Sequence, residues 1–275
     1  ALSVSASPDR ALINFERFLA ATPDSAGVLE ALSEDPRTVD ALVAVFAGSQ
    51  YLTEILLRNP PWVSLLSMHS GIARIKTAAC LATETRQVVA PWRTGAGESH
   101  REALDALRRF QQRELLRIGA ADLAGLVELA SVTSQLSLLA DAIIQATLEI
   151  VAVSANVAAA GFAVLAMGKL GGNELNYSSD VDLLFLARDD GEQHADDCRR
   201  LGERLITALT EATAAGSLYR VDMRLRPWGR VGPLVPTVEG YWKYLLGHAR
   251  LWEKQALLRA RPVAGDLQLG ARFLA

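Results

Sequence analysis

A glycine-rich turn and two carboxylates stand close together in the segment at 168–182, which reads GKLGGNELNYSSDVD. Asp180 and Asp182 are two residues apart and lead into an apolar run, LLFL. Residues two apart point to the same face of a β-strand, so we expect both carboxylates to project together while their apolar neighbours face the core. Two adjacent carboxylates repel each other, and a hard cation such as Mg²⁺ relieves that repulsion. The pattern therefore indicates phosphoryl or nucleotidyl transfer.

The turn does not match the two common glycine motifs that bind phosphate. A P-loop requires Ser or Thr after Lys169 and a glycine five residues before Gly168, and the chain has Leu170 and Ala163 at these positions. The G-x-G-x-x-G dinucleotide fingerprint does not occur there either. A Gly-Gly pair alone is weak evidence of function. This pair gains weight because it lies between an apolar strand at 162–167 and the Asp-x-Asp strand.

We expect the glycine turn to bind phosphate oxygens. The backbone N–H groups of Gly171 and Gly172 are the expected donors, and Ser178 or Ser179 adds a hydroxyl. Lys169 is a further candidate, because its ammonium group would offset phosphate charge.

A third carboxylate follows in a second alternating segment at 218–226, LYRVDMRLR. Read as a strand, this segment places Asp222, Arg224 and Arg226 on one face and apolar side chains on the other. We expect Asp222 to join the metal site and the two arginines to hold phosphate oxygens through bidentate hydrogen bonds. The alternative is an exposed amphipathic strand on which the Asp and Arg side chains only pair with each other.

These residues resemble the nucleotidyltransferases of the DNA polymerase β type. Their pattern is a strand, a Gly-Gly or Gly-Ser turn, a short helix, an Asp-x-Asp strand, and a third Asp on a neighbouring strand. More closely, the chain resembles the bifunctional glutamine synthetase adenylyltransferase/adenylyl-removing enzymes from about Gln50 onward. The segments that carry this resemblance are 107–118, 167–185, 221–235, 252–253 and 259–261.

The resemblance implies a magnesium-dependent enzyme in which Asp180, Asp182 and Asp222 hold two Mg²⁺ ions. One domain of these enzymes attaches AMP to a tyrosine of glutamine synthetase, and a related domain removes it by phosphorolysis. This chain has one such core. Met223 in VDMRLRP, with the WG and GPLV runs that follow, is more similar to the removing domain, whereas WEKQAL at 252–257 is closer to the attaching domain.

Three functions stay open on the sequence. The first is phosphorolytic removal of AMP from modified glutamine synthetase, which releases ADP. The second is ATP-dependent attachment of AMP by the same three carboxylates. The third is a non-catalytic module that binds a nucleotide or a partner. The resemblance implies glutamine synthetase and the PII signalling protein as protein partners, and phosphate with ADP or ATP as small ligands.

The periodicity predicts an α+β fold with a helical array followed by a polymerase β-like core. We expect a mainly helical region at 1–155, and a nucleotidyltransferase core at 156–275 with a small mixed sheet and C-terminal helices. The expected elements are helices within 9–67, long helices at 100–121 and 122–155, a strand–turn–strand unit from 161, a helix at 196–214, the strand at 218–226, and two helices within 237–258.

Composition excludes several classes of protein. A net charge of −3 argues against nucleic-acid binding by bulk electrostatics. Two cysteines and four scattered histidines form neither a disulfide framework nor a zinc motif. We find no signal peptide and expect no apolar run of membrane-spanning length, which predicts a cytoplasmic protein without a membrane partner. The chain starts without Met, so we expect a shortened form of a longer protein.

Overall fold

The computed structural model describes residues 6–67, 71–93 and 99–275. Within it the chain divides into two compact units. The first unit comprises residues 1–76 and 112–135, and the second comprises residues 77–111 and 136–275. Two long helices, α6 (His100–Leu123) and α7 (Leu129–Ala155), contribute residues to both units. Met68 and His69, for which the sequence suggests only a packing role, lie outside the described residues, as does most of the polar, glycine-bearing segment at 91–99.

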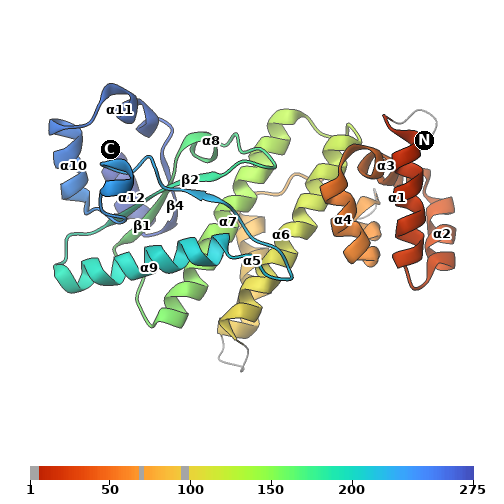
Figure 1. Cartoon of the computed structure of the whole chain (residues 1–275), viewed down its shortest axis with the longest axis horizontal. Coiled ribbons are helices and arrows are strands. Elements are labelled where there is room, and N and C mark those ends of the chain that lie inside the picture. The colour runs from red at the N-terminus through yellow and green to blue at the C-terminus, as the bar shows by residue number, and fades with distance from the viewer. Residues whose placement is uncertain (1–5, 68–70, 94–98) are drawn as a thin grey trace. The chain divides into compact units, whose positions relative to one another are not determined.

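The first unit is helical (Figure 1). Its elements are α1 (Pro8–Ala21), α2 (Ser25–Glu34), α3 (Pro36–Gly48), α4 (Gln50–Arg58), the 3-10 helix η2 (Pro60–Leu66), and parts of α6 and α7. Short polar side chains cap the starts of several of these helices. The Asp35 carboxylate accepts the N–H of Thr38 at 3.2 Å, and the Ser49 hydroxyl accepts that of Leu52 at 3.3 Å.

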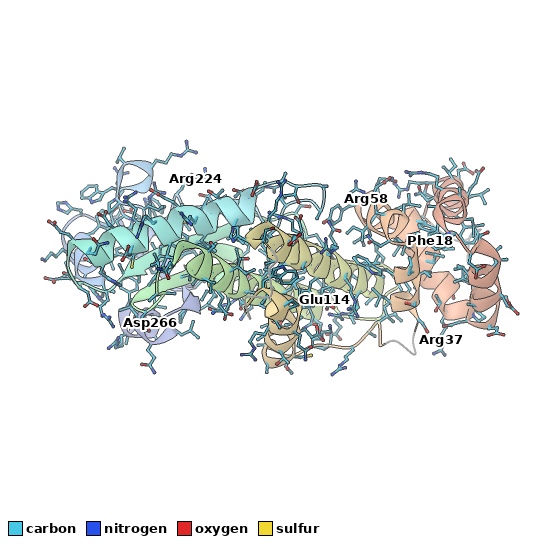
Figure 2. All side chains as sticks on the ribbon, turned by 90° about the horizontal axis from the view of Figure 1, so that it is seen from below. Phe18, Arg37, Arg58, Glu114, Arg224 and Asp266 are labelled. Atoms are coloured by element: carbon cyan, nitrogen blue, oxygen red, sulfur yellow. The ribbon has the colours of Figure 1, made fainter. Side chains whose placement is uncertain are left out.

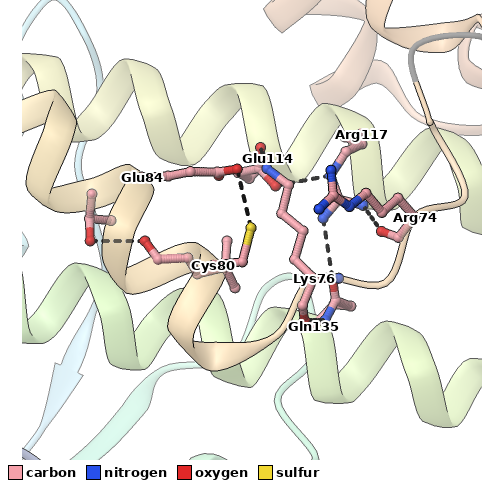
Figure 3. A network of polar contacts seen from close by, with 9 residues as sticks. Arg74, Lys76, Cys80, Glu84, Glu114, Arg117 and Gln135 are labelled. Atoms are coloured by element: carbon pink, nitrogen blue, oxygen red, sulfur yellow. Dashed lines mark hydrogen bonds and ion pairs between the residues drawn. The ribbon is translucent and has the colours of Figure 1, made fainter.

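Apolar packing and a buried ionic network hold this unit together. Phe18, labelled in Figure 2, is fully buried, and its ring centroid lies 5.8 Å from that of Phe46. In Figure 3, Glu114 accepts hydrogen bonds from Lys76 Nζ at 2.8 Å and from Arg117 Nε at 2.9 Å. The Gln135 amide bonds both the N–H and the carbonyl oxygen of Lys76, at 2.9 and 2.7 Å. Each buried charge in the network thus has an opposite charge beside it.

The second unit contains a small mixed sheet (Figure 1). Its strands are β1 (Phe162–Ala166), β2 (Val181–Ala187), β3 (Val221–Asp222) and β4 (Arg261–Gly265), in the order β3-β2-β1-β4. β1 pairs antiparallel with β2 and β4, while β2 and β3 are parallel. The other elements of the unit are α5 (Ala78–Arg93), α8 (Gly168–Gly171), α9 (Glu192–Thr210), η4 (Gly229–Val231), α10 (Val238–Gly247), α11 (Leu251–Leu257) and α12 (Leu267–Leu274).

Helices cover both faces of the sheet, so its central strands are apolar throughout. Every residue of β1 is buried, and so is every residue of β2 except Asp182. Alternate residues of these strands, such as Leu165 and Leu184, pack with Tyr241 of α10 and Phe273 of α12. On the other face, α9 approaches closely at Gly202, where a Cβ would lie 3.0 Å from the Phe185 ring. The predicted α+β class with a small mixed sheet is confirmed.

The predicted strand at 218–226 is wrong over most of its length. Only Val221 and Asp222 pair with a neighbouring strand. The Asp222 carboxylate accepts the N–H of Arg224 at 2.8 Å, which turns the chain immediately after β3. The Arg226 N–H then bonds the Met223 carbonyl at 3.4 Å. Apolar–polar alternation therefore arises here in a turn, and Arg224 and Arg226 do not share a strand face with Asp222.

Other boundaries also differ from the expected ones. α9 starts at Glu192 instead of 196, and α7 starts at Leu129 instead of 122 because the chain turns at Gly125, which has φ +66°. β4 and α12 were not predicted at all. The predicted division into 1–155 and 156–275 follows the change from helices to strands, whereas the two compact units follow packing; the domain boundaries stay a prediction.

The expectation that no apolar run reaches membrane-spanning length is wrong for α7. This helix has 27 residues and a mean hydropathy of 1.8 over its most apolar window, enough by length and composition to cross a membrane. However, 67% of that window is buried inside the protein, as in the core helix of a globular fold. Its apolar side chains are therefore used in packing.

Candidate functional site

Two of the three predicted carboxylates lie side by side on neighbouring strands. Asp182 and Asp222 are Cα partners in the parallel ladder between β2 and β3. Asp182 is half-buried, and it is the only residue of β2 that is not fully buried. Asp180 is exposed and lies just before the strand. The apolar run after Asp182 buries β2, so Asp182 lies at the start of this strand and Asp180 just before it, as the sequence predicts.

The glycine turn packs directly against Asp182. Gly168 has φ +53°, and a Cβ at this position would overlap Asp182 Oδ2. The backbone N–H of Met167 also donates to the Asp182 carbonyl at 2.8 Å. Only glycine allows this conformation and this approach together. The predicted turn therefore lies directly against one of the three predicted carboxylates.

Burial and like charges act together on Asp182. Burial raises the pKa of the Asp182 carboxyl, and the nearby Asp222 and Asp180 carboxylates raise it further. Arg224 and Lys169 oppose this shift through their positive charge. A further positive charge beside Asp182 would therefore stabilise its ionised form.

Arginines neutralise the other two carboxylates. The Asp222 carboxylate accepts hydrogen bonds from the backbone N–H and from Nε of Arg224, at 2.8 and 2.7 Å, and this bonding lowers the pKa of Asp222. Asp180 accepts a hydrogen bond from Arg220 Nε at 2.5 Å. Arg220 also donates to the Ser178 carbonyl at 2.6 Å. Arg220 was not identified from the sequence as a site residue. It could have been, because it lies two residues before Asp222 in the same alternating segment.

A cavity of about 370 Å³ lies beside these acids. Arg226 lines it with its guanidinium partly buried, and burial, then the charge of Arg230, lowers the Arg226 pKa. Within the described part of the chain, Arg226 Nε is buried without a hydrogen-bond partner. The lining residues are Asp180, Val221, Asp222, Met223, Arg224, Arg226 and Arg230. Three arginines facing one cavity are suited to an anionic ligand, and Arg230 is one that the sequence interpretation missed.

The predicted phosphate-binding residues of the turn lie outside that lining. In this structure the N–H groups of Gly171 and Gly172 donate to the Met167 and Gly168 carbonyls, at 2.8 and 3.1 Å. Lys169 Nζ donates to the Ser179 hydroxyl at 3.4 Å. The phosphate-binding roles of Lys169, Gly171, Gly172, Ser178 and Ser179 stay predictions.

A larger cleft of about 970 Å³ in the second unit holds none of the predicted residues. It is lined mainly by the end of α7 and the small residues that follow, together with Trp92 and His100. The electrostatics described above instead favour the smaller cavity beside Asp222 as the site of chemistry.

The three carboxylates fit a divalent cation by their chemistry. Mg²⁺ prefers carboxylate oxygens, and a cation would offset both the burial and the neighbouring carboxylates that raise the pKa of Asp182. Among the described residues, no group of three or more His, Cys, Asp or Glu side chains is gathered closely enough to hold a metal. Asp180 and Asp222 instead face their arginine partners. The three carboxylates are therefore of the right chemical type for Mg²⁺, but in this structure they are not gathered into a metal site, and two of them are paired with guanidinium groups.

The model of a protein family described as "Glutamate-ammonia ligase adenylyltransferase" matches residues 39–275 of this chain. The chain belongs to this family. The match begins earlier than the resemblance identified from about Gln50, and the expected membership is confirmed.

A relative within the adenylyltransferase family adds detail. The chain is 37% identical over 251 residues to the "Bifunctional glutamine synthetase adenylyltransferase/adenylyl-removing enzyme" of Chromobacterium violaceum. The alignment covers 90% of this chain and 28% of that protein. The chain thus spans little more than a quarter of the length of the relative it matches.

Proposed function

We propose that this chain is a nucleotidyl-transfer core that removes AMP from adenylylated glutamine synthetase by phosphorolysis. The observation that carries the proposal is the pairing of Asp182 and Asp222 across β2 and β3, beside an arginine-lined cavity. Family membership favours the substrate, and the similarity of VDMRLRP to removing domains favours the direction.

The reaction exchanges the phosphoester bond to tyrosine for the phosphoanhydride bond of ADP. An oxygen of inorganic phosphate attacks the phosphorus of the protein-bound AMP, and the bond from that phosphorus to the tyrosine oxygen breaks. The products are ADP and the free tyrosine, whose oxygen takes a proton from solvent. A phenol has a pKa of about 10 and is a fair leaving group, so a dedicated general acid is not required. This agrees with a cavity lining that contains no histidine.

Asp182, Asp222 and Asp180 would hold Mg²⁺. Bound there, magnesium would offset the charge of the attacking and leaving oxygens. Arg224 and Asp222 form an ion pair. An anion entering the cavity would compete with Asp222 for Arg224, and a cation would compete with Arg224 for Asp222. Arg224 and Arg226 would then hold the incoming phosphate, and the unpartnered Nε of Arg226 is a donor already placed in the lining. Lys169 is a further candidate for charge compensation.

Two alternatives use the same site. In the attaching direction, ATP donates AMP to the tyrosine and pyrophosphate leaves; the three carboxylates serve this reaction equally well. In the non-catalytic case the site binds a nucleotide without turnover, and the full set of three acids argues against it. We further propose PII as a regulatory partner, with ADP or ATP and phosphate as small ligands, and a cytoplasmic location without nucleic-acid or membrane partners.

Two incubations and a nucleotide-binding measurement separate these possibilities. The chain is mixed with AMP-modified glutamine synthetase, Mg²⁺ and phosphate, and ADP is followed by chromatography while the mass of the modified protein is measured. Phosphate-dependent ADP with loss of the AMP mass supports removal. AMP transfer to unmodified glutamine synthetase with ATP, and no ADP from the first mixture, establishes the attaching direction. Magnesium-dependent nucleotide binding without either reaction supports the non-catalytic binding module.

A further inference from the structure

A polar stripe runs along α7, the most apolar helix of the protein. Ser137, Asp141 and Gln145 are spaced four residues apart, so they lie on one face of the helix. Each of them contacts a different part of the sheet or the glycine turn, and all three belong to the second unit. The stripe was not identified from the sequence, although a polar residue at every fourth position of an apolar helix is a visible signal.

Asp141 reaches the glycine turn through Arg261 of β4. The two side chains form a bidentate pair, with Arg261 Nη1 and Nη2 at 2.6 and 3.0 Å from the Asp141 oxygens. Nη2 also donates to the carbonyl of Leu170, within α8, at 2.9 Å. Both side chains are mostly buried, 25% exposed for Arg261 and 19% for Asp141. The carboxylate therefore fixes the guanidinium that holds the turn.

Ser137 holds the other end of the same segment. Its hydroxyl accepts the N–H of Leu175 at 3.1 Å, and both residues are buried. One turn of α7 is thus linked to the chain on both sides of the Gly171–Gly172 pair, directly at Leu175 and through Arg261 at Leu170. Further along the stripe, Gln145 accepts the N–H of Gly265, the last residue of β4, at 2.9 Å. The helix therefore anchors the glycine turn and the strand that supports it.

The turn also lies directly against the chain that carries Arg261. A Cβ at Gly171 would overlap the carbonyl oxygen of Arg259 and lie 2.9 Å from that of Ala166. Any shift of the segment at 259–261 would therefore displace the turn, because backbone touches backbone with no side chain between them. Asp182 packs on Gly168, so displacement at one end of α8 would reach a catalytic candidate.

We propose that Asp141, acting through Arg261, and Ser137 are positioning residues that hold the glycine turn in place for nucleotidyl transfer. The inference rests on the proposed function for its catalytic meaning. The alternative is that the stripe only stabilises the fold, in which case loss of Asp141 would lower stability without a selective effect on residues 168–175.

Asp141→Asn tests the proposal by hydrogen–deuterium exchange on the full 275-residue chain. We expect the amides of 168–175 to exchange roughly tenfold faster or more, the size that follows from loss of a charge-assisted hydrogen bond, while β2 is unchanged. Arg261→Lys keeps the charge but cannot bridge Asp141 and Leu170 with a planar fork, so it should show the same pattern. Unchanged exchange at 168–175 in both variants would overturn the proposal.

Asp105→Asn is the matched control. Asp105 accepts hydrogen bonds from Arg108 Nη1 and the Thr213 hydroxyl, both at 2.7 Å, and its side chain is 24% exposed. It is thus a similar Asp–Arg pair in the same unit that does not contact the turn. We expect it to leave exchange at 168–175 as in the unsubstituted chain. An equal increase in all three variants would show a general loss of stability and overturn the proposal.

Kinetics supply the second readout. With AMP-modified glutamine synthetase, we expect Asp141→Asn to lower kcat by as much as about a hundredfold, with a smaller change in KM for the protein substrate, because misplacement of the turn affects the reacting geometry. Asp105→Asn should keep both constants. If the unsubstituted chain shows no turnover, the proposed function fails, while the exchange measurement still decides whether Asp141 positions the turn.

Discussion

Asp182 and Asp222 are paired residues of two parallel strands, and the two carboxyl-bearing positions lie directly opposite each other in the ladder. Asp222 is held by Arg224 and has a lowered pKa, whereas burial and its acidic neighbours raise the pKa of Asp182. The two acids thus sit in opposite electrostatic environments although they are neighbours. Such a pair is more typical of a functional site than of a structural ion pair, since it opposes stability.

Asp182→Asn should abolish activity. Asp182 lies at the centre of the site, between Gly168 and Asp222, and no other half-buried carboxylate of β2 can replace it. We expect AMP release to fall by at least about 10²–10³-fold, equivalent to roughly 3–4 kcal/mol. Initial rates measured as ADP formation check this. The control is Asp190→Asn, because Asp190 is an exposed acid just after β2, and this variant should keep the activity of the parent chain. Comparable rates for the two variants would show that Asp182 is not part of the site.

The same substitution should stabilise the metal-free protein at neutral pH. A carboxyl whose folded pKa is raised binds protons more tightly in the folded state, so it lowers stability as pH rises above its unfolded value of about 3.9. Asp182→Asn removes this effect. Thermal unfolding in a chelator should give a higher Tm than the parent chain at pH 7, and the difference should vanish near pH 4. A variant less stable than the parent at pH 7 would contradict this account.

Gly171→Ala should destabilise the second unit. The added methyl would overlap the Arg259 carbonyl oxygen, and backbone cannot move aside as a flexible side chain can. We expect a loss of about 1–3 kcal/mol in the free energy of unfolding, measured by urea denaturation. Gly247→Ala is the control, because a Cβ there meets nothing within 4 Å at the end of α10. That change should be neutral or stabilising by up to about 1 kcal/mol.

Glu114→Gln should unfold the first unit at a lower denaturant concentration. Glu114 is buried and is the carboxylate that accepts from both Lys76 and Arg117 (Figure 3). Removing its charge leaves two buried cations beside each other, which costs about 3–5 kcal/mol. Glu54→Gln, whose partner Arg17 is exposed, should cost less than about 1 kcal/mol. Equal losses in the two variants would mean that burial does not set the strength of the Glu114 network.

The helical elements and the central strands follow from short-range patterns. β1 and β2 were predictable because they are apolar runs bounded by glycines and acids, and α10 and α11 because their apolar residues recur at helical spacing. The strand predicted at 218–226 failed because alternation also occurs in turns. There the Asp222 carboxylate bonds the Arg224 N–H and ends the strand after two residues, a local contact that periodicity does not reveal.

The amino-acid sequence by itself determined the family, the α+β class and the three acids, because these depend on residue types at fixed spacing. Only the tertiary structure decided which neighbours those acids have. The bond from Arg220 to Asp180, and the contacts of Arg261 with Asp141 and Leu170, join residues up to 120 positions apart. The contacts of Arg261 depend on how α7 and β4 pack around the turn, and a pattern read along one chain carries no information on distances across it.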